Sequence, residues 1–153
     1  MNDMSEFIIL QGIQGSGKST WALDWVKEKP TERIRVSRDS IRKMFGKYWV
    51  PDREKLVEII RNACIREAIV AGYDIVCDDM NLNPNAINDI VKIAKGMKSN
   101  ISIEYKLFNT PLMDCIKRVD TRNSKLPEDE QIPISIVIST YETYKHKYNL
   151  IVE

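Results

Sequence analysis

The segment GIQGSGKS at residues 12–19 is the clearest candidate for chemistry in the chain, and it fits the pattern GxxxxGK[ST]. Its glycines leave backbone N–H groups open to phosphate oxygens, because no side chain blocks their approach. Lys18 would bridge the β- and γ-phosphates of a nucleotide, and the Ser19 hydroxyl would ligate Mg²⁺. The segment therefore predicts a site for a nucleoside triphosphate and magnesium. Its predicted phosphate-binding residues are Gly12, Gly15, Ser16, Gly17, Lys18, Ser19 and Thr20.

A second candidate lies in the basic stretch RIRVSRDSIRKMFGK at residues 33–47, which includes Arg38. Asp39 and Arg42 are three residues apart there, so a helical turn would place them on one face. A carboxylate beside an arginine stays ionised. Asp39 could therefore accept a proton from a hydroxyl group while Arg42 holds an anionic substrate. The alternative is a solvated basic face.

A pair of carboxylates, Asp78 and Asp79, directly follows the apolar run DIVC at residues 74–77. Parallel sheets bind ligands at the carboxyl ends of their strands, so a pair in this position is expected at the active edge, near the metal. The alternative is that these carboxylates cap a helix or face solvent.

Two arginines, Arg118 and Arg122, are four residues apart and precede a polar segment at residues 124–133. This spacing places both on one face of a helix. Arginines on such a helix can neutralise the charge that develops on a transferring phosphoryl group. The alternative is exposed charge, with Asp114 pairing with Arg118.

Short apolar runs alternate with segments of helical periodicity, and these elements must position the candidate residues. Strands are predicted at residues 7–10, 33–37, 74–77 and 101–108, and a closing strand at 150–153. Helices are predicted at 17–29, 39–45 and 52–71, and from Asn83, Thr110 and Pro133 onwards. In the third of these, the apolar positions are Leu56, Ile59, Ile60, Ala63, Cys64, Ile69 and Val70. The alternation predicts an α/β fold, with a mostly parallel central sheet and helices on both faces, in a single domain over residues 1–153. The polar segment is typical of a lid.

Composition limits the function classes. Hydrophobic residues make up 43% of the chain, charged residues 29%, and the net charge is +1, which indicates a globular protein without a general nucleic-acid-binding charge. The longest apolar runs have four or five residues, whereas a membrane helix needs about 20. The polar N-terminus MNDMSE does not fit a signal peptide. We therefore expect a cytoplasmic protein without a membrane partner, with Cys64, Cys77 and Cys115 as reduced, mostly buried thiols.

Four motifs occur in the order GSGKSTWA, RDSIR, DMNLNP and the R-x-x-x-R of KRVDTR. Together they resemble the kinase domain of phage polynucleotide 5′-kinases, within the P-loop phosphotransferases related to adenylate kinase. The resemblance covers residues 7–147. It implies a P-loop kinase-like three-layer sandwich with a short helical lid, which transfers the γ-phosphate of ATP to the 5′-hydroxyl of a DNA or RNA end.

The resemblance also implies roles for individual residues. Lys18 and Ser19 would bind the ATP phosphates and Mg²⁺, and Asp39 would be the general base. Arg38, Arg42 and Asp79 match the acceptor side, where Arg42 would contact the phosphate on the 3′ side of the acceptor nucleotide. Arg122 would stabilise the phosphoryl group in transfer, and Arg118 matches the first lid arginine, on the ATP side. Because members of this group can assemble, a homo-oligomer is a further expectation.

Two other readings fit the same motifs. One is a P-loop kinase that acts on a small molecule, such as a nucleoside, sugar or antibiotic hydroxyl. The other is a regulatory module that binds a nucleotide without transferring its phosphate. The basic stretch at residues 33–47 disfavours a neutral acceptor, and the pairing of an acid with an arginine disfavours a module without catalysis.

Overall fold

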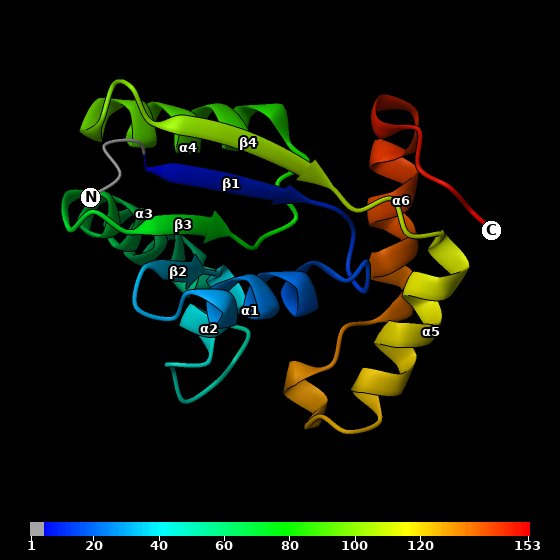
Figure 1. Ribbon diagram of the computed structural model, residues 1–153. Helices are drawn as coiled ribbons and strands as arrows, with labels where there is room; N and C mark the ends of the chain where they lie inside the picture. The colour runs from blue at the N-terminus through cyan, green and yellow to red at the C-terminus, as the bar shows by residue number, and fades with distance from the viewer. Residues whose placement is uncertain (1–4) are drawn as a thin grey trace.

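A computed structural model describes residues 5–153 and contains a four-stranded parallel sheet with the order β2-β3-β1-β4 (Figure 1). The strands are β1 (Glu6–Gln11), β2 (Arg33–Val36), β3 (Asp74–Cys77) and β4 (Ser102–Leu107). The α-helices are α1 (Lys18–Glu28), α2 (Arg38–Arg42), α3 (Glu54–Val70), α4 (Pro84–Met97), α5 (Leu112–Asn123) and α6 (Ile134–Tyr148). Two short 3₁₀ turns are η1 (Pro51–Arg53) and η2 (Glu128–Glu130). Residues 1–4, which begin the polar segment that argued against a signal peptide, lie outside the described residues.

Strand β1 lies in the middle of the sheet and is buried on both faces. Phe7 and Ile9 pack into one apolar cluster with α3 and α4, whereas Ile8 and Leu10 pack into another with α1. This alternation follows from the two-residue period of a strand. A central parallel strand must be apolar throughout, and this is why the run FIIL precedes the glycine-rich segment.

Helices cover both faces of the sheet, with α1 on one side and α3 and α4 on the other (Figure 1). The predicted α/β architecture with a parallel sheet is therefore confirmed. Helices α5 and α6 stand instead at the carboxyl end of the sheet and form a third apolar cluster, which includes Ile13 of the glycine-rich loop. The loop that follows β1 is thus packed against the last two helices.

The helix predicted at residues 52–71 is present as α3, but its buried face does not follow the apolar positions that indicated it. Leu56 and Ile59 are 45% and 50% exposed. The buried residues of α3 are Val57, Arg61, Ile65, Ala68 and Ile69. The apolar positions do not define this face by themselves, because the helix turns Arg61 inward, where it pairs with Asp79.

The C-terminal segment is not the predicted closing strand. The carbonyl oxygens of Ile151 and Val152 accept hydrogen bonds from the N–H groups of Leu112 and Met113, at 2.7 and 3.0 Å. Helix α5 starts after Pro111 without a side-chain cap. Its first N–H groups need acceptors, and the tail supplies them from its backbone.

Within residues 5–153, no helix is both long enough and apolar enough to cross a membrane.

The three cysteines are free thiols, of which Cys77 and Cys115 are buried. Cys64 lies on the exposed face of α3, so the expectation of mostly buried thiols holds for the other two.

Candidate active site at the carboxyl end of the sheet

The loop between β1 and α1 requires its glycines for steric reasons. A Cβ atom at Gly12 would lie 2.6 Å from the Ser16 Oγ. Gly15 has a φ of +78°, and its Cβ would lie 2.6 Å from the carbonyl oxygen of Cys115 in α5. Gly17, with a φ of +100°, is the N-cap of α1. The positive end of α1 therefore faces the loop, as in sites that bind phosphate at a helix N-terminus.

Lys18 is buried inside this loop. Its Nζ donates hydrogen bonds to the carbonyl oxygens of Gly12 and Ile13 at 2.8 and 2.9 Å, and to the Ser16 Oγ at 3.3 Å. Burial lowers the pKa of Lys18 to about 8, although the charges of Asp78 and Asp79 oppose that shift. The Lys18 ammonium group is therefore bound by uncharged acceptors. Phosphate oxygens can take their place, or accept further hydrogen bonds from the same group.

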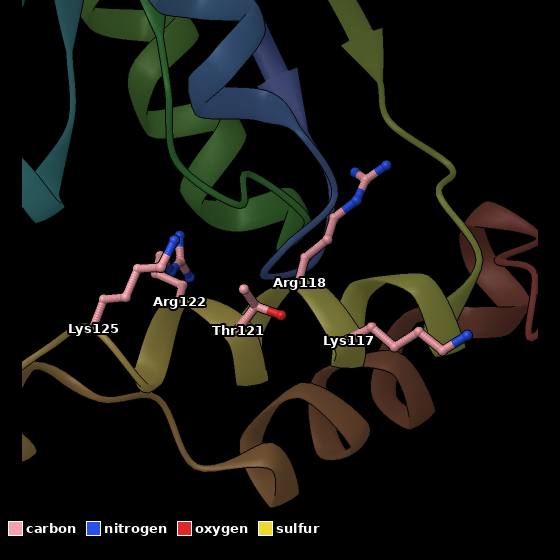
Figure 2. Close-up of a pocket in the computed structure, with 5 residues that line it drawn as sticks. All are labelled: Lys117, Arg118, Thr121, Arg122 and Lys125. Carbon is pink, nitrogen blue, oxygen red and sulfur yellow. The ribbon is translucent and has the colours of Figure 1, made fainter.

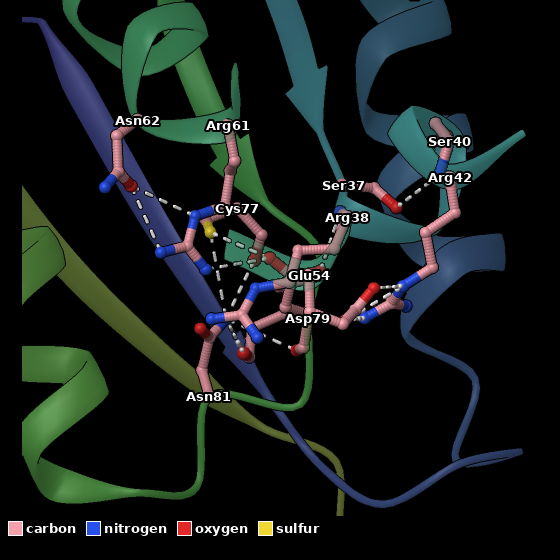
Figure 3. A network of polar contacts seen from close by, with 11 residues as sticks. Ser37, Arg38, Ser40, Arg42, Glu54, Arg61, Asn62, Cys77, Asp79 and Asn81 are labelled. Atoms are coloured by element: carbon pink, nitrogen blue, oxygen red, sulfur yellow. Dashed lines mark hydrogen bonds and ion pairs between the residues drawn. The ribbon is translucent and has the colours of Figure 1, made fainter. Parts of the chain in front are cut away.

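The carboxylates at the end of β3 are both paired. The Nε of Arg35 lies 2.7 Å from the Asp78 carboxylate. Asp79 accepts a hydrogen bond from the N–H of Arg38 at 2.9 Å and lies 3.5 Å from the Nη1 of Arg61 (Figure 3). Burial raises the pKa of Asp79, and the hydrogen bond from Arg38 and the two arginine charges work against this rise. The pair thus lies at the end of a core strand, within the electrostatic field of Lys18.

Asn81 joins the ends of the two central strands. Its Nδ2 donates to the carbonyl oxygens of Leu10 at 2.8 Å and of Cys77 at 3.3 Å. The backbone carbonyl oxygen of Asn81 accepts a hydrogen bond from the Gln11 Nε2 at 3.1 Å. The residue has a φ of 47°, a conformation that asparagine tolerates better than most residues. Sequence reasoning assigned it no role, because its contacts are visible only once β1 and β3 are side by side.

Helix α2 carries the predicted acceptor-side residues. Asp39, on its first turn, accepts a hydrogen bond from the Tyr48 hydroxyl, and its Oδ2 lies 3.7 Å from the Lys43 Nζ. Its side chain is 49% exposed, so the carboxylate remains accessible.

Arg42, on the same short helix, pairs with Glu54 rather than with Asp39. Its Nη2 lies 2.5 Å from one Glu54 oxygen, and its Nε lies 2.9 Å from the other. The guanidinium also lies 5.4 Å from the ring centre of Trp49. Burial alone would lower the pKa of Arg42, but the hydrogen bonds and charge of Glu54, with the charges of Asp39 and Asp79, raise it.

The other arginine of this region, Arg38, has a donor without a protein partner. Its Nε is buried, and within residues 5–153 it makes no hydrogen bond. A buried donor that bonds nothing costs free energy, so such a group marks a place where an acceptor is missing. Arg38 and Arg42 are therefore both suited to an anionic ligand.

The partners Glu54 and Arg61 were missed by sequence reasoning. Arg61 is only 2% exposed, in the middle of α3, and Glu54 is the first residue of that helix. Neither residue belongs to a recognisable motif. A charged residue among apolar helical positions was the only available signal for Arg61.

Helix α5 brings the two predicted lid arginines to the loop. The Nη1 of Arg118 donates to the carbonyl oxygen of Gly15 at 3.3 Å. Arg122 lines an open pocket with Lys117, Arg118, Thr121 and Lys125, and Figure 2 shows Arg122 and Lys125 lying together at one end of it. The charge of Arg122 contributes to the lowered pKa of Lys18, which places both cations in one electrostatic environment.

The elements together define a class of protein. A glycine loop between a central strand and a helix, carboxylates at the end of the neighbouring strand and a helix that supplies arginines are the parts of a P-loop kinase. A family model described as an AAA domain matches residues 7–144. The chain therefore belongs to this family of AAA domains.

Comparisons with individual proteins give a range of relatives. L-seryl-tRNA(Sec) kinase from Methanococcus maripaludis is 30% identical over 125 residues, which are 80% of this chain and 48% of that protein. The structure of a Pnkp1/Rnl/Hen1 RNA repair complex contains a similar chain, with a TM-score of 0.82, 22% identity, and coverage of 97% of this chain and 47% of that chain. The APS kinase CysC of Mycobacterium tuberculosis gives a TM-score of 0.61 at 16% identity, covering 85% and 77%. The chain thus spans about half the length of the first two relatives.

The contact between Gly15 and α5 leads to a prediction for Gly15→Ala. A Cβ there would strain the backbone and press on the Cys115 carbonyl, so the loop should shift away from its phosphate-binding shape. We expect ATP binding weakened about tenfold or more, since a left-handed alanine costs about 1–2 kcal/mol. Isothermal titration calorimetry measures this. In the matched control Gly96→Ala, the Cβ meets nothing within 4 Å, so ATP affinity should not change. Unchanged affinity in Gly15→Ala would contradict the steric argument.

The buried Lys18 predicts a pH dependence of ATP binding. Its pKa of about 8 lies below the ordinary 10.5, so the free protein loses this charge as the pH rises through about 8. A bound polyanion favours the charged form, and binding above that pH must therefore take up a proton. We expect affinity to change little up to about pH 7.5 and to fall towards tenfold per pH unit above about 8. Calorimetry in buffers of different ionisation enthalpy should show nearly one proton taken up at high pH.

Two variants serve as controls for this pH dependence. Lys18→Met should remove the proton uptake, whereas Lys27→Met, on the exposed side of α1, should retain it. Proton uptake that persists in Lys18→Met would assign it to another group.

Proposed function

We propose that this protein is a polynucleotide 5′-hydroxyl kinase, which transfers the γ-phosphate of ATP to the 5′ end of DNA or RNA with Mg²⁺ as its metal. The observation that carries the proposal is the arrangement on α2. An accessible carboxylate, Asp39, lies one helical turn from Arg42, and Arg38 beside them has a buried donor without a partner. This is a site for an acceptor that has both a hydroxyl group and a phosphate.

The nucleotide side of the proposal rests on the loop and α5. The amides of the loop and Lys18 would hold the phosphates, with Arg118 and Arg122 approaching from the lid. The Ser19 side chain is exposed on the first turn of α1, and its hydroxyl is an oxygen donor of the kind that Mg²⁺ prefers. Residues 5–153 contain no cluster of three or more acidic, histidine or cysteine ligands that could bind a metal by itself. Ser19 would thus hold Mg²⁺ together with phosphate oxygens and water, and the ion would neutralise phosphate charge.

The transfer step needs a general base and a cationic group that stabilises the charge on the phosphoryl group. The acceptor oxygen forms a bond to the γ-phosphorus while the bond to the bridging oxygen of ADP breaks, and the hydroxyl proton moves to Asp39. The hydrogen bond from Tyr48 would orient the Asp39 carboxylate. Arg122 would stabilise the phosphoryl charge in transfer, a role that acts on kcat more than on acceptor binding.

The contact between Arg42 and Glu54 supports a phosphorylated acceptor over a neutral one. The Glu54 carboxylate binds the guanidinium through two oxygens, the geometry with which arginine also binds phosphate. A phosphate of the acceptor would bind the same Arg42 donors in exchange for Glu54. The four motifs and the likeness to a chain of an RNA repair complex point to a nucleic acid. L-seryl-tRNA(Sec) kinase, one of the similar proteins, is by its name a kinase of a tRNA-bound serine.

A small-molecule acceptor is the second candidate, because the similar structures include an APS kinase and a gluconokinase. The test is a panel of acceptors offered with γ-labelled ATP and Mg²⁺. We expect label on DNA and RNA oligonucleotides with a 5′-hydroxyl, and none on the same oligonucleotides already phosphorylated at that end. Label that goes only to nucleosides, sugars, APS or seryl-tRNA would overturn the proposal. ATP binding without transfer to any acceptor would indicate a regulatory module.

The proposed base gives a separate prediction. Asp39→Asn should reduce transfer about 10²–10⁴-fold, the range that a general base contributes. ATP affinity should remain within about twofold, because the side chain belongs to the acceptor side. Single-turnover kinetics and calorimetry measure the two quantities. Asp89→Asn on the exposed face of α4 is the matched control and should change neither. A variant at Asp39 that keeps the normal rate would show that another group takes the proton.

A further inference from the structure

Strand β4 forms one margin of the sheet and has a free edge. Within residues 5–153 it pairs only with β1 (Figure 1). Most of its side chains are exposed, among them Tyr105 at 51% and Leu107 at 39%. An edge with unpaired N–H and C=O groups is a template for another strand unless something prevents pairing.

The free backbone groups belong to the odd-numbered residues. The N–H groups of Ser102 and Phe108 donate to the carbonyl oxygens of Ser5 and Gln11, at 3.1 and 2.8 Å. Alternate residues of a strand direct their backbone groups to the same side. The even-numbered residues of β4 therefore face β1, and Ile103, Tyr105 and Leu107 present their N–H and C=O groups outward.

The side chains around Tyr105 are complementary to a second copy of themselves. The order is Ile103, Glu104, Tyr105, Lys106, Leu107, with an acid on one side of the tyrosine and a base on the other. If two β4 strands pair antiparallel about Tyr105, Glu104 of each copy lies opposite Lys106 of the other. Ile103 likewise lies opposite Leu107. Opposite charges and aromatic or aliphatic residues placed in this way stabilise a sheet.

The register that pairs the opposite charges is compatible with the free backbone groups. An antiparallel pair alternates hydrogen-bonded residue pairs with closer, non-hydrogen-bonded ones. A twofold axis at Tyr105 makes the outward-facing residues the hydrogen-bonded pairs, and it puts Glu104 and Lys106 in the close positions. An axis at Glu104 or at Lys106 would use the same free backbone groups but would place two like charges directly opposite each other. An axis at Ile103 or Leu107 leaves both charges without an opposite charge.

Aromatic surface continues the same face beyond the strand. Glu104 and Lys106 line a hollow with Trp21, Trp25 and Arg33. The Lys106 Nζ lies 5.1 Å from the ring centre of Trp21. Two copies paired through β4 would bring their two hollows next to each other, so that aromatic surface on α1 adds to the contact.

We propose that two copies of this chain associate through β4, antiparallel and centred on Tyr105, so that their sheets become one continuous sheet. The acceptor-side helix α2 follows β2, at the opposite margin of the sheet. Both acceptor sites therefore remain open in the pair. The proposal is independent of the acceptor identity proposed above, and its test does not use activity.

Sedimentation velocity over a concentration series tests the association. We expect the unchanged chain to form a dimer, either a stable one or one in fast exchange with the monomer. Glu104→Lys and Lys106→Glu each place like charges opposite at both close positions, and each should raise the dimer dissociation constant about tenfold or more. The double variant Glu104→Lys/Lys106→Glu restores opposite charges and should return to about the original value. Glu67→Lys, exposed on α3, is the control for a charge change alone.

A mixture of the two single variants gives the most specific outcome. A copy with Glu104→Lys is basic at both positions, and a copy with Lys106→Glu is acidic at both. The mixture should therefore form heterodimers more readily than either variant forms homodimers, which also shows that both are folded. If the unchanged chain is monomeric at all concentrations, the proposal is overturned. The charges of Glu104 and Lys106 would then serve to prevent pairing at the edge of the sheet. An unchanged dimer dissociation constant in both single variants, Glu104→Lys and Lys106→Glu, would also overturn the proposal, because another surface would then be responsible.

Discussion

The phosphate loop rests directly on the backbone of helix α5, and this close approach governs the arrangement of the site. Gly15 permits it, because any Cβ would collide with the carbonyl oxygen of Cys115. Two further contacts hold the loop there: the Thr110 hydroxyl donates to the carbonyl oxygen of Ser16 at 2.7 Å, and Arg118 donates to that of Gly15. Ile13 is buried in the same cluster as α5 and α6. The nucleotide site and the arginine-bearing helix are therefore one packed unit, so a shift in either is transmitted to the other.

The cations of the site are held by protein acceptors that resemble the proposed ligands. Lys18 bonds backbone carbonyls where phosphate oxygens would lie, and Arg42 binds the two oxygens of Glu54. Asp79 forms an ion pair with Arg61 and accepts a hydrogen bond from the N–H of Arg38. Each pairing offsets the cost of desolvating a charge near the sheet. Ligand binding is then an exchange of partners, which is less costly than creating a charged site in an apolar surrounding.

Sequence predicted the features that depend on local geometry. The alternation of apolar runs and helical segments was sufficient for the parallel sheet, and the glycine spacing predicted a loop that leads into a helix, because both signals act over a few residues. The inward face of α3 and the course of residues 149–153 were not predictable in this way. Arg61 is buried because Asp79 meets it, 18 residues away in the chain, and the tail is held by the unsatisfied start of α5. Contacts of this kind depend on residues that are distant in the sequence. The periodicity of a single segment carries no information about those residues. The same limit explains why Glu54 and Asn81 were missed.

The order of the strands separates two kinds of surface on this protein. The margin at β2 continues into α2, which carries the residues proposed to bind the acceptor, whereas the margin at β4 leads through Phe108 and Thr110 into α5. Strand β4 is thus connected to the lid helix by a short segment whose threonine also holds the phosphate loop. A partner that binds the free edge of β4 would order the base of that segment without touching the acceptor side. Association at this edge would therefore lie nearer to the nucleotide site than to the acceptor side, because Thr110 joins the segment after β4 to the loop, whereas β1 and β3 separate β4 from β2.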